Sequence, residues 1–310
     1  LVKKNNPVLL IAGFRDSNDK NWPWEIRASS SFIDNSGYFD LETDVPGNLF
    51  TYDEPVRIKI KNGIQISEKK TISYIVYDTT GNIVTQGKND LIFEQSGQEM
   101  YLNLDIQKRG TFLIEIDIPG WEKKYTTFAR IPDLKSLTKG LPTKFGMTTS
   151  GNTTNEQVWA VAERLGFSIC RRFTQWYKLQ PAPDIYKLES IEQELKAAKK
   201  YGIDTWLCLY DPPPFAFNGK TGKISYTVFD CNIEAWRNLV STVTSKFKGS
   251  LYGWEWLNEI TPGGYKDQVK TYLQMCKVGT ETTKTIDPNI ITLLAGGLFP
   301  RGFRDQVLSE

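Results

Sequence analysis

The sequence predicts an N-terminal all-β sandwich followed by an α/β domain of the (β/α)8 barrel type. Three observations lead to this fold class. Apolar and polar residues alternate with period two up to about residue 135, as at 56–61 and 114–118. After about residue 144, short apolar runs alternate with amphipathic segments, which indicates parallel strands covered by helices. The total of 310 residues is long enough for two domains.

The β-sandwich is expected to span 41–135. Within it, 78–81 contains a glycine-bearing hairpin turn, and strands are predicted at sandwich-like spacing at 56–61, 71–77, 82–85, 100–106, 114–118 and 125–131. Neither a carboxylate pair nor a glycine-rich loop stands out here, so we expect a structural or a carbohydrate-contacting role. Residues 1–40 show little periodicity and are expected to be an extension or the end of an upstream module.

A linker is expected at 136–143, where Gly140 and Pro142 interrupt the pattern. The barrel domain follows at 144–310, with strands predicted at 144–149, 169–174, 205–210, 251–258 and 290–295. A complete barrel needs roughly 250 residues. The sequence therefore predicts a barrel truncated after about five βα units, which a C-terminal continuation or a second polypeptide completes.

An open, doubly wound sheet is the alternative architecture for the second domain. Such sheets normally carry a glycine fingerprint after the first strand, but 148–152 contains neither this fingerprint nor a P-loop. Polar residues gather instead where several different strands end, which is the pattern of a barrel active site, at Arg171, Arg172, Asp211, Asn258 and Glu259. We therefore expect the barrel.

The composition excludes several kinds of chemistry. The chain has no histidine, so it cannot by itself form a Ser-His-Asp triad or a His-ligated zinc site. Its four cysteines form no C-x-x-C pair and are expected to be buried apolar side chains, although Cys170 and Cys208 on neighbouring strands could approach each other. The net charge of +2 favours neither nucleic acid nor membrane as a partner. No metal or organic cofactor is implied.

The strongest motif is Trp254-Glu255-Trp256-Leu257-Asn258-Glu259, which follows the fourth apolar strand. It resembles the Asn-Glu signature of glycoside hydrolase clan A, whose (β/α)8 members carry the general acid/base Glu at the end of strand four. The frequent clan form, Glu-x-Trp-Asn-Glu-Pro, is changed here by Leu257 and Ile260. The similarity covers about 144–300 and is closest to the family 39-like and family 5-like members.

A second stretch supports this resemblance. The segment 166–171, with Trp176 five residues after Arg171 and then Leu179-Gln180-Pro181 and Tyr186, looks like the second strand of the clan and the loop after it. Asp184 stands where the clan has a glycine. The resemblance therefore extends over two of the predicted strands that carry polar residues.

The resemblance implies a role for each of these residues. Cleavage of a glycosidic bond needs one carboxyl group to protonate the leaving oxygen and a second to attack or stabilise the anomeric carbon. Glu259 is the expected general acid/base, Asn258 would bond the sugar 2-hydroxyl, and Arg171 would orient the second carboxylate and keep it ionised. That nucleophile, a Glu of strand seven in the clan, is expected beyond residue 310. Further substrate contacts are expected from Trp176, Tyr210, Asp211 and Trp256.

Each residue also has a purely structural interpretation. Glu259 could be salt-bridged to Arg171 and do nothing more, and Asp211, before three prolines, could be a turn residue. Glu255 is expected to be a buried acid paired with Arg or Lys, and Arg172 to point outwards to a helix.

Together these patterns predict a retaining glycoside hydrolase that acts on a poly- or oligosaccharide. The alternatives are a non-catalytic carbohydrate-binding or scaffold protein with a barrel fold, and a different carboxylate-using barrel enzyme such as a lyase, which a metal beside Asp211 and Glu259 would favour. Polysaccharide degradation and the appended sandwich favour a secreted, periplasmic or cell-surface location.

Overall fold

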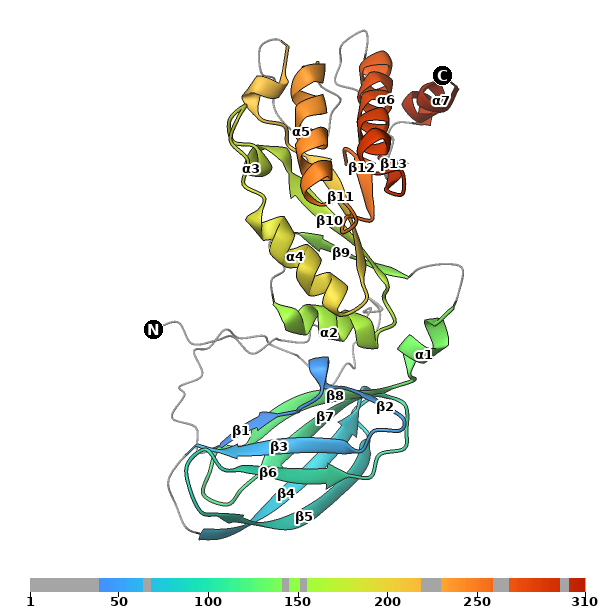
Figure 1. The fold of residues 1–310 in the computed structure, drawn as a ribbon. Coiled ribbons are helices and arrows are strands. Elements are labelled where there is room, and N and C mark those ends of the chain that lie inside the picture. The colour runs from blue at the N-terminus through green and yellow to red at the C-terminus, as the bar shows by residue number, and fades with distance from the viewer. Residues whose placement is uncertain are drawn as a thin grey trace. The chain divides into compact units, whose positions relative to one another are not determined.

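The computed structural model describes residues 39–63, 68–140, 145–150, 155–218, 230–258, 268–295 and 301–309 (Figure 1). The chain divides between Leu134 and Lys135 into two compact units. Hydrophobic side chains form a core of their own in each unit. In the described ranges, no helix is long and apolar enough to span a membrane.

The first unit contains two β-sheets that share one hydrophobic core. The three-stranded sheet is antiparallel and consists of β1 (Phe39–Glu42), β3 (Val56–Asn62) and β6 (Glu99–Leu104). The five-stranded sheet has the order β2 (Leu49–Thr51), β8 (Lys124–Ile131), β7 (Gly110–Asp117), β4 (Glu68–Asp78) and β5 (Ile83–Phe93), with the 3-10 helix η1 (Pro46–Asn48) before β2. Its strands are antiparallel except for the β2–β8 pair.

The alternation read from the sequence explains these strands. In β3, Val56, Ile58 and Ile60 are buried while the basic residues between them lie on the other face. Phe39 is buried in the same core, so the first strand begins two residues before the predicted domain start at 41. The rest of the predicted N-terminal extension, 1–38, lies outside the described residues.

The second unit is built on a parallel sheet whose strands follow one another in chain order, as in a (β/α)8 barrel. The strands are β9 (Gly146–Ser150), β10 (Ile169–Gln175), β11 (Asp204–Tyr210), β12 (Gly253–Trp256) and β13 (Ile291–Leu294). These five strands confirm the strands predicted for this half of the chain.

Helices alternate with these strands. They are α1 (Leu134–Thr138), α2 (Glu156–Arg164), α3 (Trp176–Leu179), α4 (Glu189–Lys200), α5 (Ile233–Lys246), α6 (Gln268–Ile286) and α7 (Arg301–Ser309), with the 3-10 helix η2 (Pro214–Ala216) after β11. Helix α1 lies partly in the predicted linker, 136–143. The side chains of Asn155 and Asn232 cap α2 and α5 by accepting a backbone N–H bond from the first turn.

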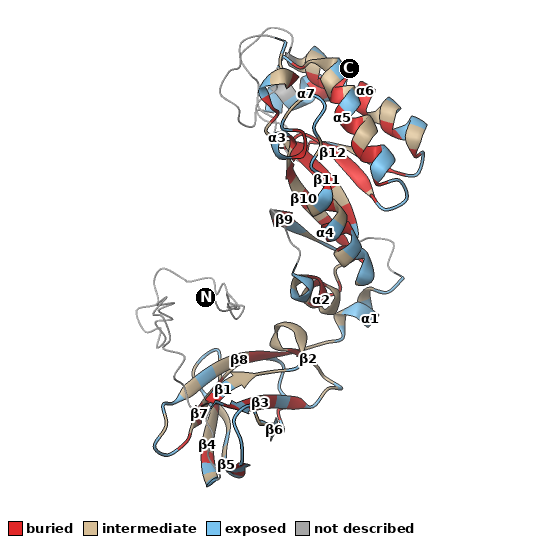
Figure 2. Ribbon diagram, turned by 60° about the vertical axis from the view of Figure 1, so that its left-hand side comes forward, coloured by how far each residue is buried: buried red, intermediate tan, exposed pale blue. Residues whose placement is uncertain are grey.

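One face of the parallel sheet packs against the helices from α2 onwards and is buried (Figure 2). Leu207, Leu209 and Trp254 on the strands belong to one buried cluster with Ile191 on α4 and Trp236 on α5. We call this side the helix face. The opposite side, called the inner face below, carries Arg171, Phe173, Trp206, Tyr210 and Glu255, of which all but Glu255 are only half-buried.

Candidate active site

The inner face gathers polar groups from three neighbouring strands. On β10, Cys170, Arg172 and Thr174 are buried on the helix face, whereas Arg171 and Phe173 alternate with them and face the other way. This alternation separates the two consecutive arginines and gives each of them a different environment.

Arg171 and Glu255 form the centre of the site. The guanidinium donates from Nε to Glu255 Oε2 at 2.6 Å and from Nη2 to Oε1 at 2.6 Å, a forked ion pair that holds both groups in one geometry. The Glu255 side chain is 3% exposed and that of Arg171 is 20% exposed. The prediction that Glu255 is a buried acid paired with a basic residue is confirmed. Arg171 therefore already carries a bound carboxylate, and it is a different one from the nucleophile that the sequence led us to expect.

Asn258 belongs to the same cluster. Its Oδ1 accepts a hydrogen bond of 2.8 Å from Arg171 Nη2, and the residue is 4% exposed. In a regular strand Asn258 would share the face of Trp256, but Leu257 has a φ of 68° and interrupts the alternation. This left-handed residue brings the Asn258 amide to the inner face.

A second left-handed residue stands at the same edge. Asp211, which follows β11, has a φ of 50°, and its carboxylate accepts a 3.0 Å bond from Gln175 Nε2. Its backbone oxygen accepts a 3.1 Å bond from Tyr177 N. Asp211 is therefore a turn residue that ties the ends of β10 and β11 together. Backbone strain of this kind is characteristic of functional edges.

Aromatic rings cover part of the inner face. The Tyr210 and Phe173 rings meet edge to face, with centroids 5.8 Å apart, and the Arg171 guanidinium carbon lies 4.5 Å from the Phe173 ring centroid. Tyr210 is only half-buried. Of the aromatic residues predicted to contact substrate, Tyr210 lies on the inner face.

The two predicted tryptophan contacts are wrong. Trp176 is 1% exposed in the helix-face core, where its Nε1 donates to Gln180 Oε1 at 2.9 Å. Trp256 is also 1% exposed, and its Nε1 donates to Thr280 Oγ1 of α6 at 3.2 Å. Both rings lie 5.4 Å from that of Trp236. Strand parity on β12 directs the Trp256 indole towards the helices, whereas Trp176 is the first residue of α3 and packs into the same core. Neither ring is available to a sugar.

Several other expectations can be placed. Glu259 lies outside the described residues, so its role stays a prediction. Arg172 does point to a helix, as predicted, because its Nε donates to Glu194 Oε2 of α4 at 2.6 Å. All four cysteines are buried, as predicted, and Cys170 and Cys208 lie on opposite faces of the sheet rather than side by side. Burial raises the pKa of the Cys170 thiol to about 11.

Sequence reasoning missed Trp206. Its indole Nε1 donates to Glu255 Oε2 at 3.1 Å, which gives that carboxylate oxygen a second donor besides Arg171. The signal was present in the strand, because Trp206 has the same parity as Tyr210 and Cys208. The Cys208 thiol also lies on this face, 3.2 Å from Arg171 Nη2.

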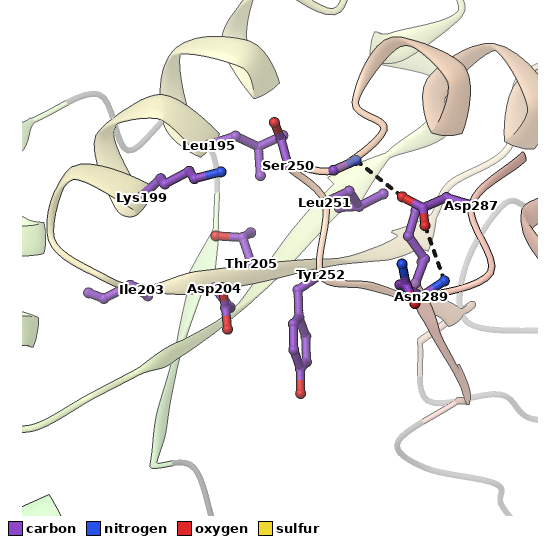
Figure 3. A pocket seen from close by; sticks show the side chains of 12 residues that line it. Leu195, Lys199, Ile203, Asp204, Thr205, Ser250, Leu251, Tyr252, Asp287 and Asn289 are labelled. Atoms are coloured by element: carbon purple, nitrogen blue, oxygen red, sulfur yellow. Dashed lines mark hydrogen bonds between the residues drawn. The ribbon is translucent and has the colours of Figure 1, made fainter. Parts of the chain in front are cut away.

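A pocket of about 310 Å³ opens at the other end of the sheet, where the strands begin (Figure 3). Asp287 joins two of its loops, because its carboxylate accepts bonds of 3.1 Å from the backbone N–H groups of Gly249 and Asn289. Lys199 of α4 and Thr205 of β11 line the same pocket. Since no predicted site residue lines it, the pocket is separate from the inner-face cluster.

Comparisons with known proteins find the same fold. No family model and no curated protein matches the sequence. A family 39 glycoside hydrolase from the gut symbiont Bacteroides cellulosilyticus WH2 superposes with a TM-score of 0.63 at 20% identity, over 84% of this chain and 51% of that one. The resemblance to clan A is confirmed at the level of the fold. The matched share of this chain exceeds either unit alone, so residues of both units take part.

Two further solved glycosidases match a smaller share of this chain. Xylanase 10B from Thermotoga maritima has a TM-score of 0.42 at 20% identity and shares 52% of each chain. Endo-glycoceramidase II from Rhodococcus sp. has a TM-score of 0.39 at 13% identity, over 50% of this chain and 48% of that one. The present chain thus spans about half the length of each of these three solved structures.

Proposed function

We propose that this chain contributes the acid/base half of a retaining glycoside hydrolase that cleaves O-glycosidic bonds of a poly- or oligosaccharide. The observation that carries the proposal is the inner-face cluster of Arg171, Glu255 and Asn258, which runs from β10 to the end of β12, where Asn258 directly precedes Glu259. Active sites of (β/α)8 enzymes are built at this end of the strands, from groups on several of them.

The proposed chemistry assigns a separate task to each group. Glu259 protonates the glycosidic oxygen as the bond breaks and afterwards removes a proton from the attacking water. Asn258 donates an N–H bond to the sugar hydroxyl beside the reacting carbon, which strengthens in the transition state. A second carboxylate from the rest of the protein attacks the anomeric carbon. Tyr210 and Asp211 are proposed to contact the sugar, while Arg171 holds Asn258.

The architecture is part of the proposal. The first unit would be a β-sandwich, and the parallel sheet would form the first five strands of an eight-stranded barrel. Within the described residues, β9 and β13 each pair with one strand, and Ile291 and Leu294 of β13 are 38% and 41% exposed. These apolar edge positions suit further parallel strands, from a C-terminal continuation or a second polypeptide. The substrate would be met outside the cytoplasm: secreted, in the periplasm or at the cell surface.

One observation favours a second candidate, a non-catalytic carbohydrate-binding or scaffold protein with the same fold. The Arg171 guanidinium, expected to hold the nucleophile ionised, is already paired through two nitrogens with Glu255. Its positive charge is therefore largely compensated before any other carboxylate arrives. A binding protein would need only the donors and rings of the inner face.

An activity assay of the natural polypeptide that contains this sequence distinguishes the two candidate functions. The polypeptide is incubated with a panel of oligosaccharides and aryl glycosides, and the first product is followed by proton NMR. We expect hydrolysis with initial release of the anomer that the substrate contained. Release of the opposite anomer would contradict retention. Binding of oligosaccharides without hydrolysis of any glycoside would replace the proposal by the binding protein.

A further inference from the structure

Trp206 lies on the inner face and donates a hydrogen bond to Glu255, but it has no role in the proposed chemistry. On β11, Trp206 lies beside Arg171 of β10 on one side and beside Gly253 of β12 on the other. It therefore stands between the two strands that carry the ion pair. A Cβ at Gly253 would lie 3.3 Å from the Trp206 Cβ and 2.9 Å from the Ile291 carbonyl oxygen. The absence of a side chain at Gly253 leaves this space to the neighbouring strands.

A continuous series of hydrogen bonds joins Trp206 to Asn258. The Glu255 carboxylate accepts from Trp206 Nε1 at 3.1 Å and from Arg171 Nε and Nη2 at 2.6 Å each. Arg171 Nη2 then donates to Asn258 Oδ1 at 2.8 Å. These three N–H donors fix the rotamer of the Glu255 carboxylate. Because two of the bonds come from the planar Arg171 guanidinium, that group has little freedom to rotate.

The direction of the last bond determines what Asn258 offers. An amide carries one acceptor oxygen and one NH₂ donor, and here the oxygen faces the guanidinium. If the amide turned over, its NH₂ group would face another donor and the bond would be lost. The side chain is thus held with its donor group directed away from Arg171.

We propose that Trp206 and Glu255 are positioning residues, which hold Arg171 and through it fix the Asn258 amide so that it presents N–H to a sugar hydroxyl. The inference rests on the proposed function, because it names the residues that set the orientation of the group next to Glu259. It also predicts the required ligand chemistry: the substrate must carry an oxygen acceptor beside the reacting carbon, and a deoxy sugar loses the benefit.

The first test uses the natural polypeptide without any sugar. Side-chain amide resonances are recorded by ¹⁵N–¹H NMR, and that of Asn258 is assigned by its loss in Asn258→Asp. We expect Trp206→Phe and Glu255→Gln to shift the Asn258 resonances. The matched control is Trp254→Phe, which removes an indole bond of the same 3.1 Å length to Thr244 on the helix face and should leave them in place. Unchanged resonances in the first two variants would overturn the proposal.

The second test uses the natural polypeptide and a pair of aryl glycosides that differ only in having a hydroxyl or a hydrogen at position 2. We expect the preference for the hydroxyl substrate, as a ratio of kcat/KM values, to fall about tenfold in Trp206→Phe and in Glu255→Gln but to persist in Trp254→Phe. An equal fall in all three variants would indicate general loss of structure and contradict positioning. If neither glycoside is cleaved, the proposed function fails, and the amide resonances still decide the positioning role.

Discussion

Arg171 and Arg172 are neighbours in sequence, and each forms an ion pair at 2.6 Å, yet the two pairs lie on opposite faces of one sheet. On the helix face, the side chains of Arg172 and Glu194 are 5% and 0% exposed. On the inner face, Arg171 keeps 20% of its side chain exposed. The same chemistry therefore occurs in a closed setting and in an accessible one.

The further partners of each pair show what the difference means. Glu194 Oε1 accepts a hydrogen bond from Thr149 Oγ1 at 3.2 Å, and Arg172 Nη1 donates to Thr174 Oγ1 at 2.8 Å. The other hydrogen bonds of the helix-face pair are therefore made to threonine hydroxyls of the same sheet. The inner-face pair continues to Asn258 at the end of the strands. We interpret the first pair as a support of the fold and the second as a support of the site.

Breaking the helix-face pair should have the largest effect on stability. Glu194→Gln leaves Arg172 buried without a counter-charge, and we expect the free energy of unfolding to fall by about 3–5 kcal/mol. Urea denaturation followed by tryptophan fluorescence measures this change. Glu192→Gln on the same helix is the control, because its pairs with Lys196 and Lys246 involve side chains that are at least 39% exposed. A loss below about 1 kcal/mol in Glu194→Gln would remove the distinction between the faces.

Breaking the inner-face pair should cost less stability and more binding. Solvent reaches Arg171, so we expect Glu255→Gln to lower the free energy of unfolding by about 1–3 kcal/mol. Oligosaccharide affinity of the natural polypeptide, measured by calorimetry, should fall about tenfold in this variant and remain unchanged in Glu194→Gln at temperatures where both are folded. Equal loss of affinity in both variants would contradict the separate roles.

Features that depend only on which face of a strand a residue occupies could be predicted from the sequence. Period-two alternation located the strands, and it also paired Glu255 with a basic residue and turned Arg172 towards a helix. The predicted sugar contacts of Trp176 and Trp256 failed for different reasons. Trp256 has the strand parity of Trp254, which is buried on the helix face, and this parity was given less weight than its nearness to Glu259. The Trp176 contact followed from the resemblance of the second-strand stretch, but Trp176 is the first residue of α3 and packs into the same core.

Other features depend on backbone geometry that no residue type announces. Leu257 adopts a left-handed conformation although it is neither glycine nor asparagine, and this single residue places Asn258 on the inner face. The bond from Trp206 to Glu255 needs the register of β11 against β12, which becomes known only when the sheet is formed. A sequence pattern limits the faces of a strand but leaves its register open.

A smaller effect is expected in the first unit at Asp78, the last residue of β4, which stands beside the hairpin turn and pairs with the exposed Lys108. The Thr80 hydroxyl and the Lys108 ammonium lower the pKa of Asp78. Because the folded pKa is depressed, this stabilisation is fully present above the unfolded value near 3.8 and is lost as the pH falls towards the folded one. The stability difference between wild type and Asp78→Asn, from urea curves between about pH 6 and pH 3, should therefore shrink on acidification. A difference that grows on acidification would contradict this sign.

The central claim is that Glu259 donates the proton to the leaving group. It is tested most directly by measuring kcat/KM of the Glu259→Gln variant of the natural polypeptide on substrates with different leaving groups. The control variant is Glu234→Gln, because Glu234 is an exposed acid at the start of α5. If Glu259 donates the proton, kcat/KM should fall by about 10²–10⁴ on substrates with poor leaving groups and far less on activated aryl glycosides, which need little protonation to depart. Glu234→Gln should match wild type on both. An equal loss on the two substrate classes would show that Glu259 is not the proton donor.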